Sequence, residues 1–437
     1  MDSSVLLAAL GAIIGVIALM YLAYKGLATV LYTTIAVVIV CLFSGIDLIE
    51  GIFNIYAMET GKYLGQYLFL FITGAVFGRI YQSTGAAASI ANALGKVFRG
   101  KSALIAIVLA TVIMGMAGIS GFILIFTVFP IGIVLFQKAN INKRLFPAIF
   151  ATGAWTIANC MPGSTQIHNV VPTRVLGTSP MAGWEVGIPF AVLAAVINIL
   201  YVLWENKRLT AQGIVFDSYE DVTIHENASK LKPIPFLAAL FPIVLILVLF
   251  NALNLRVEIA VFIGDIVAVA MFWKRIPAKQ WLDAVTEGSA ESVRVLVDTA
   301  IIVGFGAVII KSPLYDFTLN WVSTTNMNPY LLAAIAANLF ALIMGSCASA
   351  VNLVMQSLGP VFLGFAEQGY NLGFIHRIVS QAATGLDTLP HCGALLTVFG
   401  VCHVNHKLSY KYVFVCTVLT PLILVFLMQV PLANLLT

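Results

Sequence analysis

The sequence predicts an all-α integral membrane fold built from two inverted repeats, each with one re-entrant hairpin and one broken helix. Of the 437 residues, 60% are hydrophobic and only 10% are charged, whereas soluble globular proteins carry about 25% charged residues. Apolar runs of about 17–20 residues recur along the chain, which suits spanning helices better than the strands of a barrel. The first run, Val5 to Ala23, lacks a basic start and a cleavage site, so we interpret it as a retained helix.

Short sequence matches recur about 230 residues apart, in the same order in both halves of the chain. The matched segments are Ile113–Gly115 with Ile343–Gly345, Pro130 with Pro360, Gly74–Val76 with Gly306–Val308, and Ala151–Gly153 with Ala383–Gly385. An internal repeat in an apolar chain is typical of a secondary transporter.

The long polar stretch 205–234 divides the chain into a first repeat, 1–204, and a second repeat, 235–437. We place this linker in the cytoplasm because it carries Lys207, Arg208 and Lys232, and basic loops stay inside. Counting spans away from the linker puts both termini outside and inverts the second repeat. In the second repeat we expect Trp281–Val293 to form a surface helix ahead of the span Val295–Ile310. The net charge of +4 lies mostly in short loops and does not indicate nucleic-acid binding.

Two apolar segments, 103–135 and 331–365, are each too short for two spans and a turn, which need about 40 residues or more. We therefore predict that each is a re-entrant hairpin that goes partway across the membrane and returns. Their tips, Gly115–Gly121 and Gly345–Ala350, are rich in small residues. Such residues let the backbone turn and let a ligand approach closely.

Two further segments, 145–176 and 374–404, are predicted to be broken helices. Proline and glycine interrupt them at Asn159–Ser164 and at Leu389–Gly393. Unwound backbone at membrane depth is tolerated where it lines a cavity or is buried in protein. A plain proline kink explains one break, but two breaks at corresponding places favour a site. Free N–H groups and helix N-termini there would suit a carboxylate.

The candidate site residues lie at these tips and breaks. The predicted substrate-binding residues are Gly118, Ser120, Gly121, Ser164, Thr165, Gln166, Asn169, Ser346, Ser349, Asn352, Thr388 and Gly393.

Asp387, His391 and His168 are candidate proton carriers, because ionisable groups inside a membrane are costly and histidine titrates near neutral pH. Two alternatives stay open: His168 as a packing residue and Asp387 as a helix cap. Arg174 could attract an anion, but its place near the end of its span favours an interfacial anchor.

Three other functions are weaker. Gly118–Gly121 resembles the serine motif of rhomboid intramembrane proteases, with His168 as a possible base, but rhomboid cores lack a second inverted copy. A channel would give no reason for two opposed hairpins. A zinc site is disfavoured because His391 and Cys402 lie about 16 Å apart on a helix. We predict no catalytic residue, metal or cofactor.

Gly385–Ala394 resembles the stretch G-L-D-S-L-P-H-N-G-A of the gluconate permease family, part of the ion transporter superfamily, in its branch of hydroxybutyrate permeases. Pro162–Asn169, followed by Pro172, is similar to that branch's P-G-[ST]-x-Q-I-x-N-x-x-P. Gly85–Ala87 also fits. Cys392 stands where the branch usually has asparagine, and His168 where it usually has glutamine.

The resemblance implies a bacterial inner-membrane symporter that takes up a small organic acid with protons. It also implies a homodimer whose hairpins and broken helices move as an elevator against a scaffold of Leu27–Gly78 and Val257–Ile310. We expect a short hydroxylated monocarboxylate as substrate, with 3-hydroxybutyrate first. Gluconate or another sugar acid and sodium coupling remain alternatives. The expected partners are thus the carboxylate, protons or Na⁺, and the lipid bilayer.

Overall fold

The computed structural model describes residues 2–25, 27–98, 100–216, 232–317, 327–390 and 392–437. Helices joined by turns make up these residues, and no β-strand occurs among them. The predicted all-α class is therefore confirmed. His391 lies outside the described residues.

Five helical stretches of the described chain are long and apolar enough to cross a membrane. They are Glu50–Thr84, Trp184–Ala211 (α9), Ala278–Ile310 (α13), Cys347–Ala366 (α16) and His406–Leu436. The first joins a π-helical turn to α3 (Ala57–Thr84), and the last alternates α- and π-helical turns up to α21 (Val430–Leu436). Other apolar helices of the described chain include α1 (Ser3–Tyr24), α2 (Thr29–Ser44) and α11 (Phe236–Asn251).

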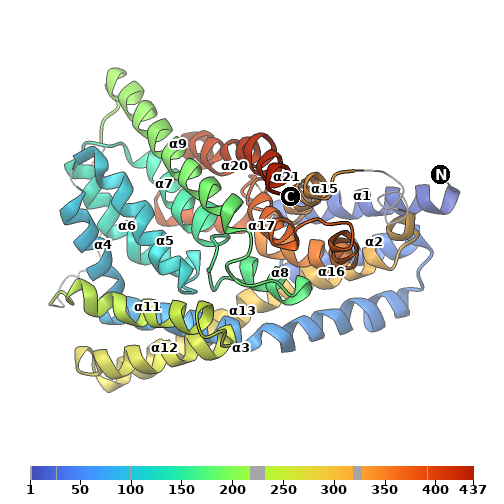
Figure 1. The fold of residues 1–437 in the computed structure, drawn as a ribbon, viewed down its shortest axis with the longest axis horizontal. Coiled ribbons are helices and arrows are strands. Elements are labelled where there is room, and N and C mark those ends of the chain that lie inside the picture. The colour runs from blue at the N-terminus through green and yellow to red at the C-terminus, as the bar shows by residue number, and fades with distance from the viewer. Residues whose placement is uncertain (1, 26, 99, 217–231, 318–326, 391) are drawn as a thin grey trace.

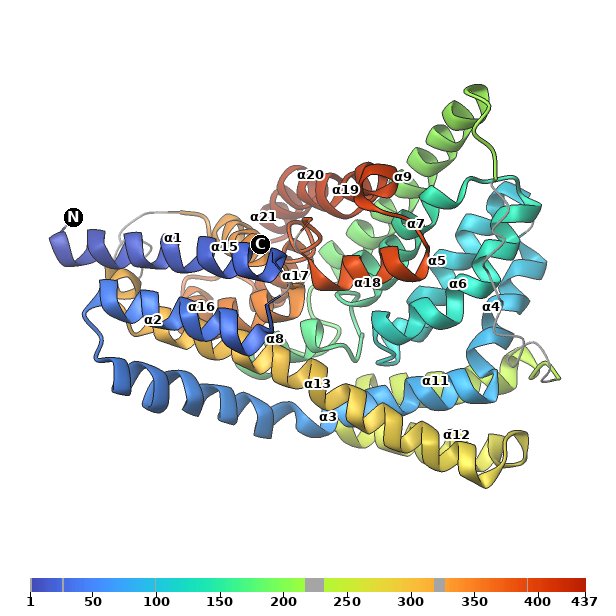
Figure 2. The same cartoon turned by 180° about the vertical axis from the view of Figure 1, so that it is seen from behind.

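The prediction of a separate surface helix at Trp281–Val293 is wrong, because α13 runs without a break through 33 residues. No proline or glycine separates Val293 from Val295, and α13 packs along α3. The two helices run along the lower side of the molecule in both views (Figures 1 and 2). Where they meet, a Cβ on Gly288 would lie 3.1 Å from the Cα of Val76. The missing side chain allows this close approach.

Each of the two tips, which are rich in small residues, joins a pair of packed helices. α5 (Ala103–Met116) and α6 (Gly121–Lys138) form the first pair, and α15 (Pro329–Met344) and α16 form the second. The pairs lie towards opposite ends of the molecule, with α8 (Ile167–Leu176) and α17 (Leu372–Ala382) between them (Figures 1 and 2). α5 has 14 residues, too few to cross a bilayer, but α16 has 20. The length argument for partial crossing thus applies to α5 and not to α16.

Helical structure is interrupted in both segments where proline and glycine occur. In the first, α7 (Phe146–Ala151) continues as a π-helical turn, η4 (Thr152–Ala158), and helix resumes only at α8. In the second, α17 ends at Ala382 and α18 (Gly393–Val401) begins eleven residues later. Both gaps are largely buried, so side chains and neighbouring backbone must satisfy their polar groups.

The two halves pack their hairpins and broken helices in matching ways. The helix that precedes each gap packs on the first arm of its own hairpin, as η4 on α5 and α17 on α15. The helix that follows each gap packs on the second arm of the other hairpin, as α8 on α16 and α18 on α6. Each second arm also contacts a long central helix, as α6 on α3 and α16 on α13. These contacts bring tips and gaps of both halves into one central region.

Candidate functional site

The first gap is tied to the first hairpin tip by hydrogen bonds. Thr165 donates to the Met116 carbonyl from its backbone N–H, at 3.0 Å, and from its hydroxyl, at 2.9 Å. The Gln166 amide donates to the carbonyls of Gly115, at 2.7 Å, and Ile119, at 3.2 Å. The last carbonyls of a helix lack partners within it. These side chains therefore satisfy the end of α5 and hold the tip against the gap.

Gly118 sits at the point of this tip with φ +100°, a conformation that favours glycine. A Cβ there would lie 3.1 Å from the Thr165 hydroxyl oxygen, and Gly74 of α3 is also close. Ser120 and Gly121 follow, and α6 begins at Gly121. The tip thus touches both the gap and a central helix.

Two of the predicted binding residues help to shape the gap itself. The Ser164 hydroxyl donates to the Ala158 carbonyl at 2.7 Å. The Asn169 amide donates to the carbonyls of Ser164, at 2.8 Å, and Pro180, at 3.1 Å. Both side chains are fully buried. They replace backbone partners that the broken helix has lost.

The second gap meets the second hairpin at a carboxylate. The Asp387 carboxylate lies close to the backbone N–H groups of Cys347 and Thr388. Cys347 is the first residue of α16, so this buried carboxylate lies at a helix N-terminus, where negative charge is favourable. Asp387 Oδ1 has no hydrogen-bond partner among the described residues.

The other predicted residues of the second half surround this point. Ser346 is the N-cap of α16 and accepts from the Ser349 N–H, while the Ser349 hydroxyl lies 3.2 Å from that of Ser346. The Thr388 hydroxyl lies 2.5 Å from that of Thr417. Gly393 is the first residue of α18.

Asn352 lies one turn further along α16 and is buried. Its amide donates to the Tyr63 hydroxyl of α3 at 3.2 Å and to the Ala348 carbonyl at 2.8 Å. The residue thus joins the second hairpin to a long central helix.

His168 is the second residue of α8, and its side chain is buried. Its backbone carbonyl accepts from the Ser380 hydroxyl at 2.9 Å, whereas Nδ1 of its ring has no partner among the described residues. His391, the other histidine proposed to carry a proton, falls outside the described chain.

A buried arginine beside the first gap was not among the predicted site residues. Arg377 of α17 is fully buried and donates to the carbonyls of Cys160, at 2.7 Å, and Ala182, at 2.9 and 3.1 Å. It also donates to Asn169 Oδ1 at 2.9 Å and to the Pro180 carbonyl at 3.2 Å. No carboxylate of the described chain pairs with it. An arginine in an apolar run is a detectable signal, because such a charge is costly in a membrane.

His376, next to Arg377, links the same gap to a turn that follows α8. Its Nε2 lies 2.9 Å from Asn169 Oδ1, and its Nδ1 lies 2.8 Å from the Thr178 hydroxyl. The Asn169 oxygen also accepts from Arg377, so we assign the Nε2 proton to the bond with Asn169. Nδ1 then accepts from Thr178.

Apolar helices, two interrupted spans and polar groups gathered in the protein interior define a multi-pass membrane transporter. The sequence profile of the GntP family permeases matches residues 5–364, and the chain belongs to this family. It is also 28% identical to the uncharacterized transporter YxjC of Bacillus subtilis (strain 168), over 92% of this chain and 94% of that protein. The chain is thus a transporter and not an enzyme, and the protease interpretation of Ser120 is wrong.

Proposed function

We propose that this permease couples the entry of protons to the uptake of a small hydroxylated monocarboxylate. The observation that carries the proposal is that each gap contacts a hairpin tip, through the hydrogen bonds of Gln166 in the first half and through Asp387 beside the start of α16 in the second. Four helices begin at these tips and gaps: α6, α8, α16 and α18. Their N-terminal N–H groups and dipoles favour a carboxylate.

Substrate recognition is assigned to the polar groups at these helix starts. Ser120 and Ser346 are partly exposed and stand at the tips of the two hairpins. Their hydroxyls can both donate to and accept from a substrate. A carboxylate at one helix start and a substrate hydroxyl at the other would use both halves of the chain.

Asp387 explains how a proton and an organic anion would bind together. Its carboxylate already occupies the N-terminus of α16, and two carboxylates at close range repel each other. A proton on Asp387 removes that repulsion, so each ligand strengthens the binding of the other. His168 and His391 are further candidates for the proton.

The matching contacts of the two halves support an inverted repeat, with the hairpins and broken helices as the moving part. Under this proposal α3 and α13 belong to the scaffold of a homodimer, which moves little during transport.

Contacts of charged residues support a cytoplasmic linker and outward-facing termini. Arg275 donates to the Lys232 carbonyl, and Glu205 pairs with Arg208 at 3.2 Å and with Lys411 at 3.9 Å. Basic residues thus gather at one end, as expected for the cytoplasmic side of a bacterial inner membrane.

The test is uptake of labelled 3-hydroxybutyrate into proteoliposomes, with a proton gradient or a sodium gradient imposed in turn. 3-Hydroxybutyrate is the first candidate because of the motif around Asp387. Accumulation driven by protons and displaced by unlabelled 3-hydroxybutyrate is the expected result. Stronger displacement by gluconate would assign a sugar acid instead, and accumulation driven only by sodium would change the coupling ion.

A further inference from the structure

A cavity of about 630 Å³ lies outside the group of tips and gaps. Its walls are the second half of α8 with the turn after it, and the loop between α11 and α12 (Val257–Phe272). The volume is within the range of about 300–1,000 Å³ that is usual for small-molecule sites. None of the predicted site residues lines it.

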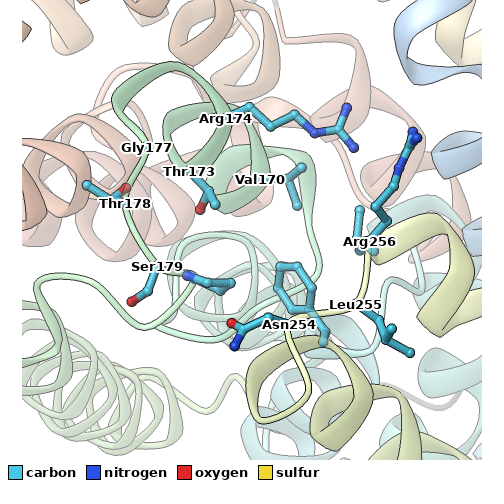
Figure 3. Close-up of a pocket in the computed structure, with 12 residues that line it drawn as sticks. Val170, Thr173, Arg174, Gly177, Thr178, Ser179, Asn254, Leu255 and Arg256 are labelled. Atoms are coloured by element: carbon cyan, nitrogen blue, oxygen red, sulfur yellow. The ribbon is translucent and has the colours of Figure 1, made fainter.

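The charged residues that line this cavity are two arginines, Arg174 and Arg256. In Figure 3 both lie on one side of the cavity, across from Thr178 and Ser179. Glu258, which does not line the cavity, pairs with Arg174 at 2.5 Å and with Arg256 at 3.5 Å. Two guanidinium groups and one carboxylate leave one positive charge at this wall.

The two arginines are held very differently. Arg174 is 26% exposed, and its guanidinium lies 5.2 Å from the ring centre of Tyr67 in addition to its ion pair. The ion pair is compatible with the predicted interfacial anchor, which stays a prediction. Arg256 is 73% exposed and its described contact is the one at 3.5 Å. Its guanidinium can therefore turn to a ligand at little cost.

The cavity is connected by hydrogen bonds to the first gap. Thr178 lines the cavity, and its hydroxyl lies 2.8 Å from Nδ1 of the buried His376. Nε2 of the same ring lies 2.9 Å from Asn169, within the gap region. A chain of hydrogen bonds thus joins the cavity to the first gap.

We propose that this cavity is an entry site for the organic anion, where Arg256 and then Arg174 hold its carboxylate before translocation. A planar guanidinium binds a carboxylate through two parallel hydrogen bonds. Thr173, Thr178 and Ser179 also line the cavity, and their hydroxyls can form hydrogen bonds with a substrate hydroxyl. The inference rests on the proposed carboxylate transport. Under the proposed topology the cavity opens to the outer face.

The test compares uptake of labelled 3-hydroxybutyrate into cells that carry the wild type, Arg256→Gln or Arg208→Gln. Arg208 is the matched control, because it is 54% exposed and pairs with Glu205 at the polar end of α9. Loss of the entry site should raise KM about three- to tenfold in Arg256→Gln and leave Vmax unchanged. Arg208→Gln should keep both constants. Added salt should raise the wild-type KM and have less effect on the variant, because it screens the Arg256 charge.

A second variant tests whether the change in KM reflects only the loss of the ion pair between Arg256 and Glu258. Arg174→Gln combined with Glu258→Gln keeps the local net charge and should also raise KM. If the wild type takes up the acid normally and both Arg256→Gln and the double variant have the same KM as the wild type, the entry site would be overturned but the transport proposal would stand. A wild type that takes up neither 3-hydroxybutyrate nor gluconate would overturn both the transport proposal and the entry site.

Discussion

Arg377 gives the sharpest prediction for stability. Arg377→Met replaces the arginine by an apolar side chain of similar length to its aliphatic stem and so removes the guanidinium. The carbonyls of Cys160 and Ala182 then lose the only donors described for them, whereas Pro180 and Asn169 keep other partners. Each buried carbonyl left without a donor costs about 1–3 kcal/mol, so the variant should lose about 2–6 kcal/mol.

This loss can be measured in purified protein in detergent, heated with a maleimide dye. All six cysteines are buried, so labelling reports unfolding. We expect Arg377→Met to lower the melting temperature by about 5 °C or more. Arg377→Lys, which keeps the charge but has fewer donors, should fall between. Arg208→Met removes an exposed arginine and should cost less than about 1 kcal/mol. A melting temperature of Arg377→Met equal to that of the wild type would refute the reasoning.

Three further changes test the tips and gaps. Gly118→Ala places a Cβ 3.1 Å from the Thr165 hydroxyl at φ +100°, so uptake should fall at least about threefold. Gly364→Ala, where a Cβ meets open space, should transport as the wild type does, and equal uptake by both variants would contradict the claim. Gln166→Glu turns a donor to two carbonyls into an acceptor and should reduce uptake about tenfold or more. Unchanged uptake would show that the hydrogen bonds between Gln166 and the first hairpin tip are not needed for transport. Asp387→Asn keeps an acceptor for α16 but cannot titrate, so proton-driven accumulation should stop while substrate exchange without a gradient continues. Intact accumulation would assign the proton to another residue.

Local chemistry made much of the helical fold predictable. Apolar runs marked the spans, and proline with glycine marked the places where helix stops, because proline removes a backbone donor and glycine relaxes the chain. The predicted surface helix divided α13 at a point where no helix breaker separates Val293 from Val295. The packing of α13 on α3 along its length is a tertiary contact that hydropathy alone does not show.

The candidate site was only partly accessible from the sequence. Gln166 and Asp387 stood out because polar residues beside a break need partners. The structure shows Gln166 bonded to the first hairpin tip and Asp387 close to the start of α16. Asn352 was also singled out, but its bond to Tyr63 joins segments 289 residues apart and no local pattern indicates it. Arg377 carried a signal, a charge within a buried helix, whereas its acceptors across the chain could not be foreseen.

The central claim is that the tips of both halves bind the same substrate molecule. In a protein without its native cysteines, Ser120→Cys and Ser346→Cys place one thiol at each partly exposed tip, and Ser289→Cys on α13 serves as control. The measurement is the rate of thiol labelling with and without 3-hydroxybutyrate. We predict that the substrate slows labelling at both tips and leaves the control unchanged. Protection at one tip only, or at neither in a protein that transports this acid, would contradict a shared site.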